Sequence, residues 1–197
     1  MERAPVTESI GVGMIGCGTV GGGVGRLLEE QAELYAHRLG RPIDLRRVLV
    51  RDAGRSDRGP GIAPATLTDD PDAFFATEAM PIVIEVAGGT DAAGAYVRRA
   101  LEAGKHVVTA NKALLAAEGP ALFALARQHE VSIAFEAACA AGMPCVTALQ
   151  FGLMANDVRG LYGILNGTCN DILTAMTRHG QSYDQALAEA QRKGFAE

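Results

Sequence analysis

The chain lacks tryptophan and is poor in aromatic residues, with four tyrosines and six phenylalanines among 197 residues. No apolar run approaches the roughly 20 residues that a membrane-spanning helix needs, and the N-terminal MERAPVTES lacks the basic-then-apolar order of a secretory signal. Lysine and arginine number 18 against 23 aspartates and glutamates, for a net charge of −5, and no basic cluster occurs. We therefore expect a cytoplasmic protein with no membrane and no nucleic-acid partner.

Cysteine is also scarce. The four cysteines show no C-x-x-C spacing and stand at Cys17, Cys139, Cys145 and Cys169. In a chain of this length they are typical of reduced thiols in a cytosolic protein, so we expect neither a disulfide framework nor a zinc site.

Glycine, by contrast, is abundant, with 24 residues. Hydrophobic residues at 48% and charged residues at 21% are close to globular averages, and the length predicts one or two domains with a buried core. Because the glycines follow no G-x-y period, they indicate many tight turns and close backbone approaches.

Short apolar runs alternate with helical patterns over the first 135 residues. Strands are predicted at residues 10–15, 45–50, 82–86, 106–109 and 132–135. Apolar spacing predicts helices at 20–35, at 96–101 with a stop at Gly104, and at 114–126 with an interruption or start near Gly119–Pro120. Residues 51–71 are typical of a loop. This alternation predicts an α/β fold, namely a Rossmann-type doubly wound parallel sheet with right-handed crossovers and helices on both faces.

The pattern changes near residue 136, where we place a domain boundary. Residues 161–165 (LYGIL) are predicted to form a strand, and a helix around Ile172 is predicted to end at Gly180. Ser182, with Gln185 three residues later, is a capping-box pattern for a last helix at 183–193. We therefore predict a first domain at residues 1–135 and the incomplete beginning of a second, α+β domain at 136–197.

A glycine motif, Gly16-Cys-Gly18-Thr-Val-Gly21, fits G-x-G-x-x-G. It follows a predicted strand and opens an amphipathic helix, which is the context in which this motif binds a dinucleotide. Gly16 permits the tight turn, Gly18 lets the backbone approach a pyrophosphate, and Gly21 lets the helix and strand pack closely. The helix N-terminus then faces the phosphates, so we expect a dinucleotide cofactor rather than a ligand-free turn.

The end of the second predicted strand, Val50-Arg51-Asp52, bears on the choice of cofactor. An arginine there accepts the 2′-phosphate of NADP, whereas an acidic residue binds the ribose 2′-hydroxyl of NAD. Because Arg51 comes first, we expect NADP, while Asp52 leaves NAD open. Arg55 and Arg58 are further candidates for the phosphate, and a solvated loop charge is the alternative interpretation of Arg51.

Two more segments follow predicted strands, Ala87-Gly88-Gly89-Thr90 and Thr109-Ala110-Asn111-Lys112. Ligands of doubly wound sheets bind outside the carboxyl ends of the strands. Gly88 and Gly89 would let the nicotinamide ribose pass close to the backbone. Lys112 is a candidate to hold a substrate oxygen or a ribose hydroxyl, and an ordinary lysine at a helix start is the alternative.

Together these features resemble homoserine dehydrogenase. The matching stretches cover nearly the whole chain: IGCGTVGGGV, EAGKHVVTANKALLA, FEAACAAGMP, GILNGTCNDIL and ALAEAQRKGFAE. The resemblance implies reduction of L-aspartate 4-semialdehyde to L-homoserine with NAD(P)H, in the aspartate-derived route to threonine, methionine and isoleucine. It also implies a homodimer in the full-length protein, formed through a catalytic and dimerisation domain that begins here at residue 136.

The resemblance also implies roles for individual residues. The cofactor-binding set would be Gly16, Gly18, Thr19, Val20 and Gly21 in the loop, with Gly88, Gly89 and Thr90 on the nicotinamide side. Lys112 would lie at the junction of cofactor and substrate and is the catalytic candidate. The substrate would be held by Asn166, Gly167, Thr168 and Glu197. A monovalent cation such as sodium would be bound, mostly through backbone carbonyls, by Glu136, Cys139, Ala141 and Met143.

The sequence departs from the family pattern in two ways. Cys169 and Asp171 replace a threonine and an aromatic residue in the usual motif, which would alter packing in the substrate pocket. In the family, acidic residues and a lysine taken as the proton donor come shortly after the position of Glu197, where this sequence stops. We therefore expect an N-terminal portion of the enzyme that binds cofactor but turns over substrate poorly or not at all.

Two other functions stay open. A phosphorylating semialdehyde dehydrogenase would use Cys139, Cys145 or Cys169 as a nucleophile activated by a histidine, and none of the four histidines has an obvious pairing. A nucleotide-sensing or scaffold module would keep the glycine motif without the chemistry.

Overall fold

The computed structural model describes residues 8–55, 59, 61–140 and 142–194. The chain divides into two compact units, Met1–Ala138 and Cys139–Glu197, which are described separately below. Within the described ranges, no helix is both long and apolar enough to cross a membrane.

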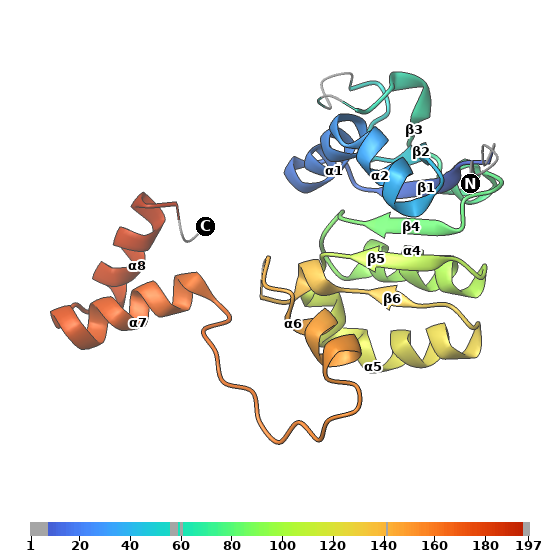
Figure 1. The fold of residues 1–197 in the computed structure, drawn as a ribbon. Helices are drawn as coiled ribbons and strands as arrows, with labels where there is room; N and C mark the ends of the chain where they lie inside the picture. Colours follow the sequence, from blue (N-terminus) through green and yellow to red (C-terminus); the bar gives the residue numbers. More distant parts are fainter. Residues whose placement is uncertain (1–7, 56–58, 60, 141, 195–197) are drawn as a thin grey trace. The chain divides into compact units, whose positions relative to one another are not determined.

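The first unit is built on a six-stranded parallel sheet with the order β3-β2-β1-β4-β5-β6 (Figure 1). The strands are β1 Ile10–Ile15, β2 Ile43–Leu49, β3 Leu67–Thr68, β4 Ile82–Glu85, β5 His106–Thr109 and β6 Ile133–Ala134. This is the strand order of the doubly wound dinucleotide-binding fold. From β1, the chain adds strands first on one side, β2 and β3, and then on the other, β4 to β6, so the strand order reverses between β1 and β4. The predicted α/β fold class is confirmed.

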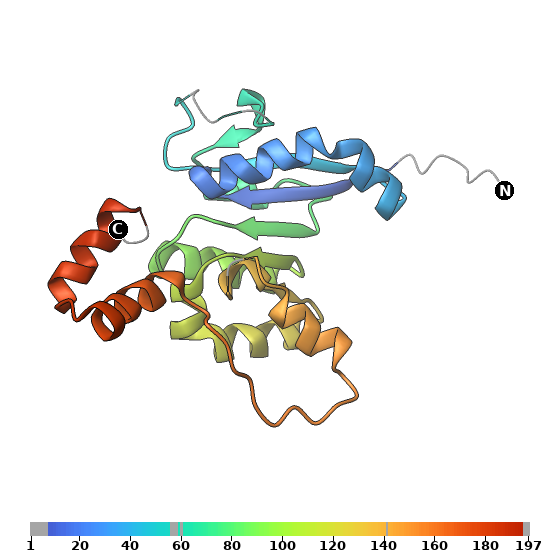
Figure 2. The same ribbon diagram turned by 60° about the vertical axis from the view of Figure 1, so that its left-hand side comes forward.

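Helices connect the strands and cover the sheet, with α1 and α2 running alongside β1 (Figure 2). They are α1 Thr19–Glu30, α2 Ala32–Leu39, α3 Pro71–Phe75, α4 Asp91–Glu102 and α5 Lys112–Gln128, with 3₁₀ turns η1 Pro64–Thr66 and η2 Glu136–Ala138. Neighbouring strand residues point to opposite faces. Ile15 therefore packs in a cluster with residues of α4 and α5, whereas Met14 packs in a second cluster with Val24 of α1. Both faces are buried around β1, but the prediction of cover on both faces is wrong for β5, where Val107 and Thr109 are buried while His106 and Val108 are exposed.

The prediction of a loop over residues 51–71 is wrong in part. It contains η1 and β3, and α3 begins at its end. A two-residue strand has no detectable alternation, and β3 exists because Leu67 and Thr68 pair with the end of β2. The start of α3 did have a local signal, since the Asp70 side chain accepts a hydrogen bond from the Asp72 N–H at 2.8 Å and Pro71 occupies the first helical position.

Two helix predictions also need correction. The single helix predicted at 20–35 is two helices separated by the non-helical Gln31, whose N–H still donates to the Leu27 carbonyl. Helix α5 is not interrupted near Gly119 but continues through Pro120. An internal proline costs about 3 kcal/mol, and burial of Leu114 and Leu122 on either side of it offsets that cost.

The second unit is helical in its described part. It contains α6 Cys145–Thr147, the π-helical turn η3 Ala148–Gly152, α7 Gly167–His179 and α8 Tyr183–Arg192. Helix α7 ends where predicted, at Gly180 with φ +64°. Helices α7 and α8 pack through a small buried cluster of Ile172, Ala186 and Ala190.

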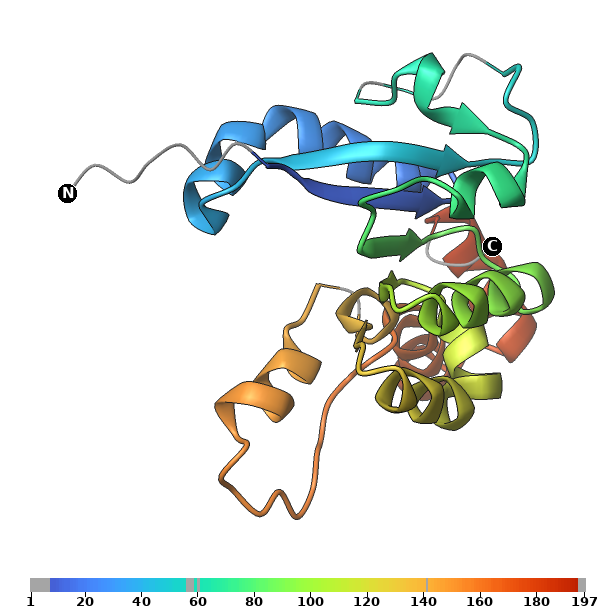
Figure 3. The same cartoon turned by 90° about the vertical axis from the view of Figure 1, so that its right-hand side faces the viewer.

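The strand predicted at 161–165 is not formed. Residues 157–166 lie between η3 and α7 without regular structure, in the open stretch of chain seen in Figure 3, and Tyr162 is 97% exposed. A strand needs a neighbour to pair its backbone N–H and C=O groups, and no described residue provides one here. The apolar side chains of this segment are consequently exposed.

The capping box at the start of α8 is confirmed, and it predicts how a substitution of Ser182 changes the stability of this helix. The Ser182 Oγ accepts from the Gln185 N–H at 3.3 Å, and the Gln185 Oε1 accepts from the Ser182 N–H at 3.0 Å. We expect Ser182→Ala to destabilise α8 by about 1 kcal/mol. Amide hydrogen exchange at Gln185 should quicken, while exchange in the β1–β5 sheet stays constant; unchanged protection of Gln185 would contradict the prediction.

Candidate functional site

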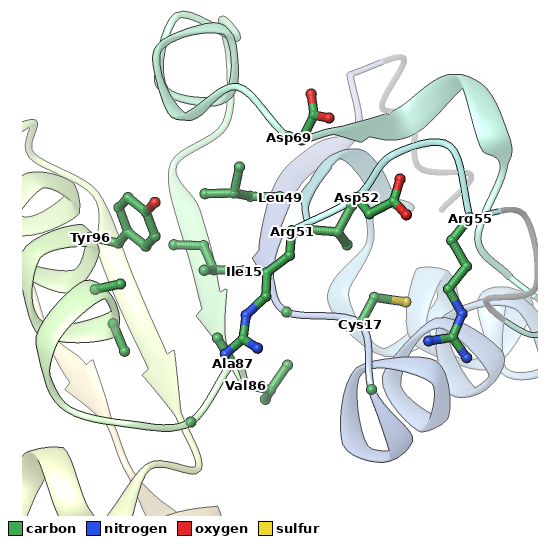
Figure 4. A pocket seen from close by; sticks show the side chains of 16 residues that line it. Ile15, Cys17, Leu49, Arg51, Asp52, Arg55, Asp69, Val86, Ala87 and Tyr96 are labelled. Atoms are coloured by element: carbon green, nitrogen blue, oxygen red, sulfur yellow. The ribbon is translucent and has the colours of Figure 1, made fainter.

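A pocket of about 570 Å³ lies at the carboxyl ends of β1, β2 and β4 (Figure 4). Its walls include Ile15 and Gly16 after β1, Leu49 to Asp52 after β2, and Val86 to Gly88 after β4. This is the point where the strand order reverses, which is where ligands bind in open α/β sheets. The fold therefore places a cavity at the position that the glycine motif predicts for a dinucleotide.

The three glycines of the motif have the three different environments that their proposed roles require. Gly16 has φ +94°, and a Cβ there would lie 2.6 Å from the Cα and the N of Ala87. A Cβ on Gly21 would lie 2.5 Å from the Gly16 carbonyl oxygen, so α1 packs directly on the turn. A Cβ on Gly18 would meet nothing within 4 Å, and Gly18 lines the pocket. Of the three, only the middle glycine therefore faces open space.

Helix α1 begins immediately after this turn, at Thr19 and Val20. Gly18 is its N-cap, and no side chain caps it. The first N–H groups of a helix have no partner within the helix, and they attract anions together with the helix dipole. Thr19 and Val20 are both exposed at this turn, and Val20 is 55% exposed although it is apolar.

Charged residues form one wall of the pocket: Arg51, Asp52, Arg55 and Asp69. In Figure 4 the Arg51 guanidinium reaches toward Val86 and Ala87, while Arg55 extends from the opposite end of the same loop. The Asp52 Oδ1 accepts the Gly54 N–H at 2.9 Å. Two cationic and two anionic side chains thus flank the end of β2, where a ribose 2′ substituent is recognised in this fold.

The loop after β4 contributes Val86, Ala87 and Gly88 to the pocket. Gly88 and Gly89 have φ +74° and +76°, a conformation that glycine adopts without strain. Gly89 and Thr90 do not line the pocket, and Thr90 is the N-cap of α4. Lys112 is exposed at the first position of α5, outside the pocket lining.

A buried polar network that the sequence motifs did not predict lies beneath these loops. Glu85, Thr109 and Asn111 are the buried polar or charged residues among those described. The Thr109 hydroxyl donates to the Glu85 Oε2 at 2.7 Å, and the Ala87 N–H donates to the Glu85 Oε1 at 3.0 Å. One signal was available: Glu85 is the charged residue within the otherwise apolar run IVIEV.

Of the predicted cofactor residues, the pocket brings together Gly16, Gly18, Arg51 and Gly88. Gly21 instead lets α1 pack against the turn at Gly16. The other predicted cofactor residues lie outside the pocket lining: Thr19, Val20, Gly89, Thr90 and Lys112. The pocket also includes residues that the sequence did not single out. Asp69 follows β3, and Tyr96 projects from α4. Both depend on a strand order that one sequence cannot reveal.

The predicted substrate residues of the second unit lie at the start of α7. Asn166 caps this helix, its Oδ1 accepting the Cys169 N–H at 2.8 Å. Gly167 and Thr168 line a small surface pocket together with Asn170, Asp171 and Thr174. Asp171 lies 3.8 Å from the Lys193 Nζ, and the pKa of Lys193 is raised chiefly by its hydrogen bond to Glu189. Glu197 lies outside the described residues.

The predicted cation ligands divide between the units. Glu136 belongs to η2 of the first unit, Cys139 and Met143 belong to the second, and Ala141 lies outside the described residues. Ala140 and Gly142 both have positive φ, +53° and +82°. Within the described part of the chain, no group of three or more histidine, cysteine or acidic side chains is arranged to hold a metal. A site made of backbone carbonyls does not depend on such a group.

Both parts of the chain match known families. Residues 16–136 match the model described as homoserine dehydrogenase, NAD binding domain, and residues 144–197 match the model described as homoserine dehydrogenase. The first match shows that the pocket belongs to a nucleotide-binding domain.

Curated relatives and solved structures agree with these matches. Homoserine dehydrogenases of Pseudomonas aeruginosa and Corynebacterium glutamicum are 43% and 42% identical over 96% of this chain. The chain spans only 43% and 42% of their lengths. A homoserine dehydrogenase structure from Thiobacillus denitrificans matches with a TM-score of 0.83 and 42% identity, covering 96% of this chain and 44% of that one. On the fold, the pocket and these matches, the chain belongs to the homoserine dehydrogenase family.

Proposed function

We propose that this chain binds NADP(H) and contributes to the reduction of L-aspartate 4-semialdehyde to L-homoserine. The observation that supports it most is the open face of Gly18 at the start of α1, in a pocket at the reversal of strand order. In this proposal residues 1–135 form the NAD(P)-binding domain, and residues 136–197 begin a catalytic and dimerisation domain. This chain spans less than half the length of the relatives, so we propose the complete reaction for the whole protein and not for these 197 residues alone.

The residues of the pocket fit a dinucleotide. The Gly18 backbone and the first N–H groups of α1 would hold the pyrophosphate, and Gly16 and Gly21 would shape the turn. Arg51 would contact the adenosine ribose, and Gly88, Gly89 and Thr90 would border the nicotinamide side. When bound, the nicotinamide supplies or accepts the hydride, and the protein supplies binding and orientation.

Lys112 is the proposed catalytic residue of this chain. It stands at the start of α5, directly after the carboxyl end of β5, on the same edge of the sheet as the pocket. An ammonium group there would stabilise negative charge that develops on the carbonyl oxygen of the aldehyde. Asn166, Gly167 and Thr168 are proposed to border the substrate, and Glu197 is proposed to bind its amino group.

A cysteine-based alternative receives no support from His106. His106 begins β5, so it lies at the amino end of the strand, opposite the pocket, and its Nδ1 pairs with the Ser132 hydroxyl at 2.9 Å.

The proposal separates cofactor binding from turnover. We expect the purified 197-residue chain to bind NADPH, measured by the change in nicotinamide fluorescence, and to oxidise it slowly or not at all with aspartate semialdehyde. The reaction also needs a general acid for the alcohol oxygen, which the resemblance places beyond Glu197. Rapid NADPH oxidation by the chain alone would contradict the second part, and absence of NADPH binding would contradict the first.

Preference for NADP over NAD is proposed to depend on Arg51. A hydrogen bond to a charged group contributes about 1.5–3 kcal/mol, so we expect Arg51→Ala to weaken NADPH binding by roughly 10- to 100-fold. NADH binding should change little, because NADH lacks the 2′-phosphate. Arg38→Ala, on the exposed side of α2, is the matched control and should leave both affinities unchanged. Equal losses for NADPH and NADH would show that Arg51 does not select the cofactor.

Three further features belong to this proposal. A monovalent cation such as sodium is proposed to bind to Glu136 and to the backbone carbonyls of Cys139, Ala141 and Met143. Oxygen donors that include a single carboxylate suit a singly charged cation. The full-length protein is proposed to be a homodimer and to act in the cytoplasm. Sedimentation of the full-length protein tests the dimer, and sodium NMR relaxation with and without Glu136→Gln tests the cation site.

A further inference from the structure

The carboxylate of Glu85 is buried at the end of β4, with 0% of the residue exposed. It is flanked by Ile15 on β1 and by Thr109 on β5, with which it is in register. It does not line the pocket. Burying a carboxylate costs free energy unless its oxygens are hydrogen-bonded, and an apolar residue at this position would bury without that cost.

Four donors converge on the two carboxylate oxygens. Oε1 accepts the N–H groups of Ala87 and Gly88 at 3.0 and 3.3 Å, and the Asn111 Nδ2 at 3.5 Å. Oε2 accepts the Thr109 hydroxyl at 2.7 Å. Among the described residues, no lysine or arginine forms an ion pair with it. An ionised carboxylate is an acceptor only, so it matches a site that consists of donors.

The same hydrogen bonds continue to the start of α5. The Thr109 hydroxyl accepts the Asn111 N–H at 3.0 Å, and the Asn111 Nδ2 donates to the Gly89 carbonyl at 2.7 Å. The Asn111 Oδ1 caps α5 by accepting the Leu114 N–H at 3.1 Å. The loop after β4 and the first turn of α5, which begins at Lys112, are therefore joined through one buried network.

We propose that Glu85 is a positioning residue for the nicotinamide half of the cofactor site. Its carboxylate fixes the loop Ala87–Gly89 and, through Thr109 and Asn111, the start of α5 at Lys112. The inference rests on the proposed function. The doubly wound fold binds a dinucleotide with two mononucleotide halves on either side of the strand reversal. Glu85, on β4, serves the half beyond β1, whereas Arg51 and the end of β2 serve the adenosine half.

The test compares a complete cofactor with a fragment that lacks nicotinamide. In Glu85→Gln the amide NH₂ faces either the Ala87 and Gly88 N–H groups, as donor against donor, or Thr109, whose hydroxyl then loses its acceptor. We expect NADPH binding to weaken about 10-fold or more, since hydrogen bonds to a charged acceptor are lost. Binding of 2′,5′-ADP, which fills only the adenosine half, should stay unchanged. Glu102→Gln, at an exposed position of α4, is the control for the loss of charge.

Thr109 provides a second variant that keeps the carboxylate. Thr109→Val removes the hydroxyl that donates to Glu85 and should reproduce the same division between NADPH and 2′,5′-ADP, whereas Thr109→Ser, which retains the hydroxyl, should restore NADPH binding. Equal loss of both ligands, or of neither, in the Glu85 and Thr109 variants would overturn the inference.

Hydrogen exchange tests the loop independently of any ligand. The Ala87 and Gly88 amides should exchange faster in Glu85→Gln than in the wild type, while amides of β1 and β2 keep their protection. If the wild-type chain bound no NADPH, the proposed function would fail even though this exchange difference was observed. If the exchange at Ala87 and Gly88 were unchanged, the positioning role would fail whatever the cofactor binding.

Discussion

Gly18→Ala is expected to weaken NADPH binding by roughly 10- to 100-fold, corresponding to one or two lost hydrogen bonds to a charged group, and to leave the stability of the fold unchanged. Gly18 has φ −90°, which alanine adopts readily, and an added Cβ meets no protein atom within 4 Å. That empty space is where we propose the pyrophosphate approaches the backbone. A methyl group there displaces the phosphate from the N–H groups at the start of α1.

Two measurements check this result on the same sample. Fluorescence titration gives the NADPH affinity, and urea denaturation gives the free energy of unfolding. Normal affinity in Gly18→Ala would place the phosphates elsewhere, and a large fall in stability would show that the methyl group does meet protein.

Gly16→Ala, by contrast, is expected to lower the stability of the first unit by about 2–5 kcal/mol. A left-handed backbone costs an L-residue roughly 1–2 kcal/mol, and overpacking adds about 1–3 kcal/mol. At Gly16 both apply, because φ is +94° and the Cβ would lie 2.6 Å from two backbone atoms of Ala87. Backbone atoms of β4's loop cannot move aside as a flexible side chain does.

Gly40→Ala separates the two contributions. Gly40 also has a positive φ, +72°, but a Cβ there meets nothing within 4 Å, so only the backbone strain remains. In urea denaturation, Gly40→Ala should lose about 1–2 kcal/mol, clearly less than Gly16→Ala. Equal losses in the free energy of unfolding would mean that the close approach of Gly16 to Ala87 does not contribute to the destabilisation.

Local sequence predicted a structural element correctly wherever the interactions that form the element lie within one short segment. The apolar runs predicted β1, β4 and β5 to the residue or nearly so. The end of α7 at Gly180 and the Ser182–Gln185 capping box followed from backbone conformation and hydrogen bonds within a few residues. The glycine motif predicted the turn between β1 and α1, which borders the pocket, because its three glycines act within one strand–turn–helix unit.

Local sequence failed wherever distant residues decide the outcome. The run at 161–165 has the composition of a strand, yet no described strand pairs with it. Pro120 indicated a break in α5, yet buried residues on both sides keep the helix continuous. Strand β3 exists only as a pairing with β2.

By itself, the sequence determined the α/β class and the dinucleotide motif, because periodicity and turns are properties of short segments, and its quoted stretches carried the resemblance to the family. The tertiary structure alone decided the strand order, the membership of Asp69 and Tyr96 in the pocket, and the partners of Glu85. Glu85 and Thr109 are 24 residues apart. They meet because parallel pairing aligns the ends of β4 and β5, and a buried carboxylate must find its donors wherever the fold brings them.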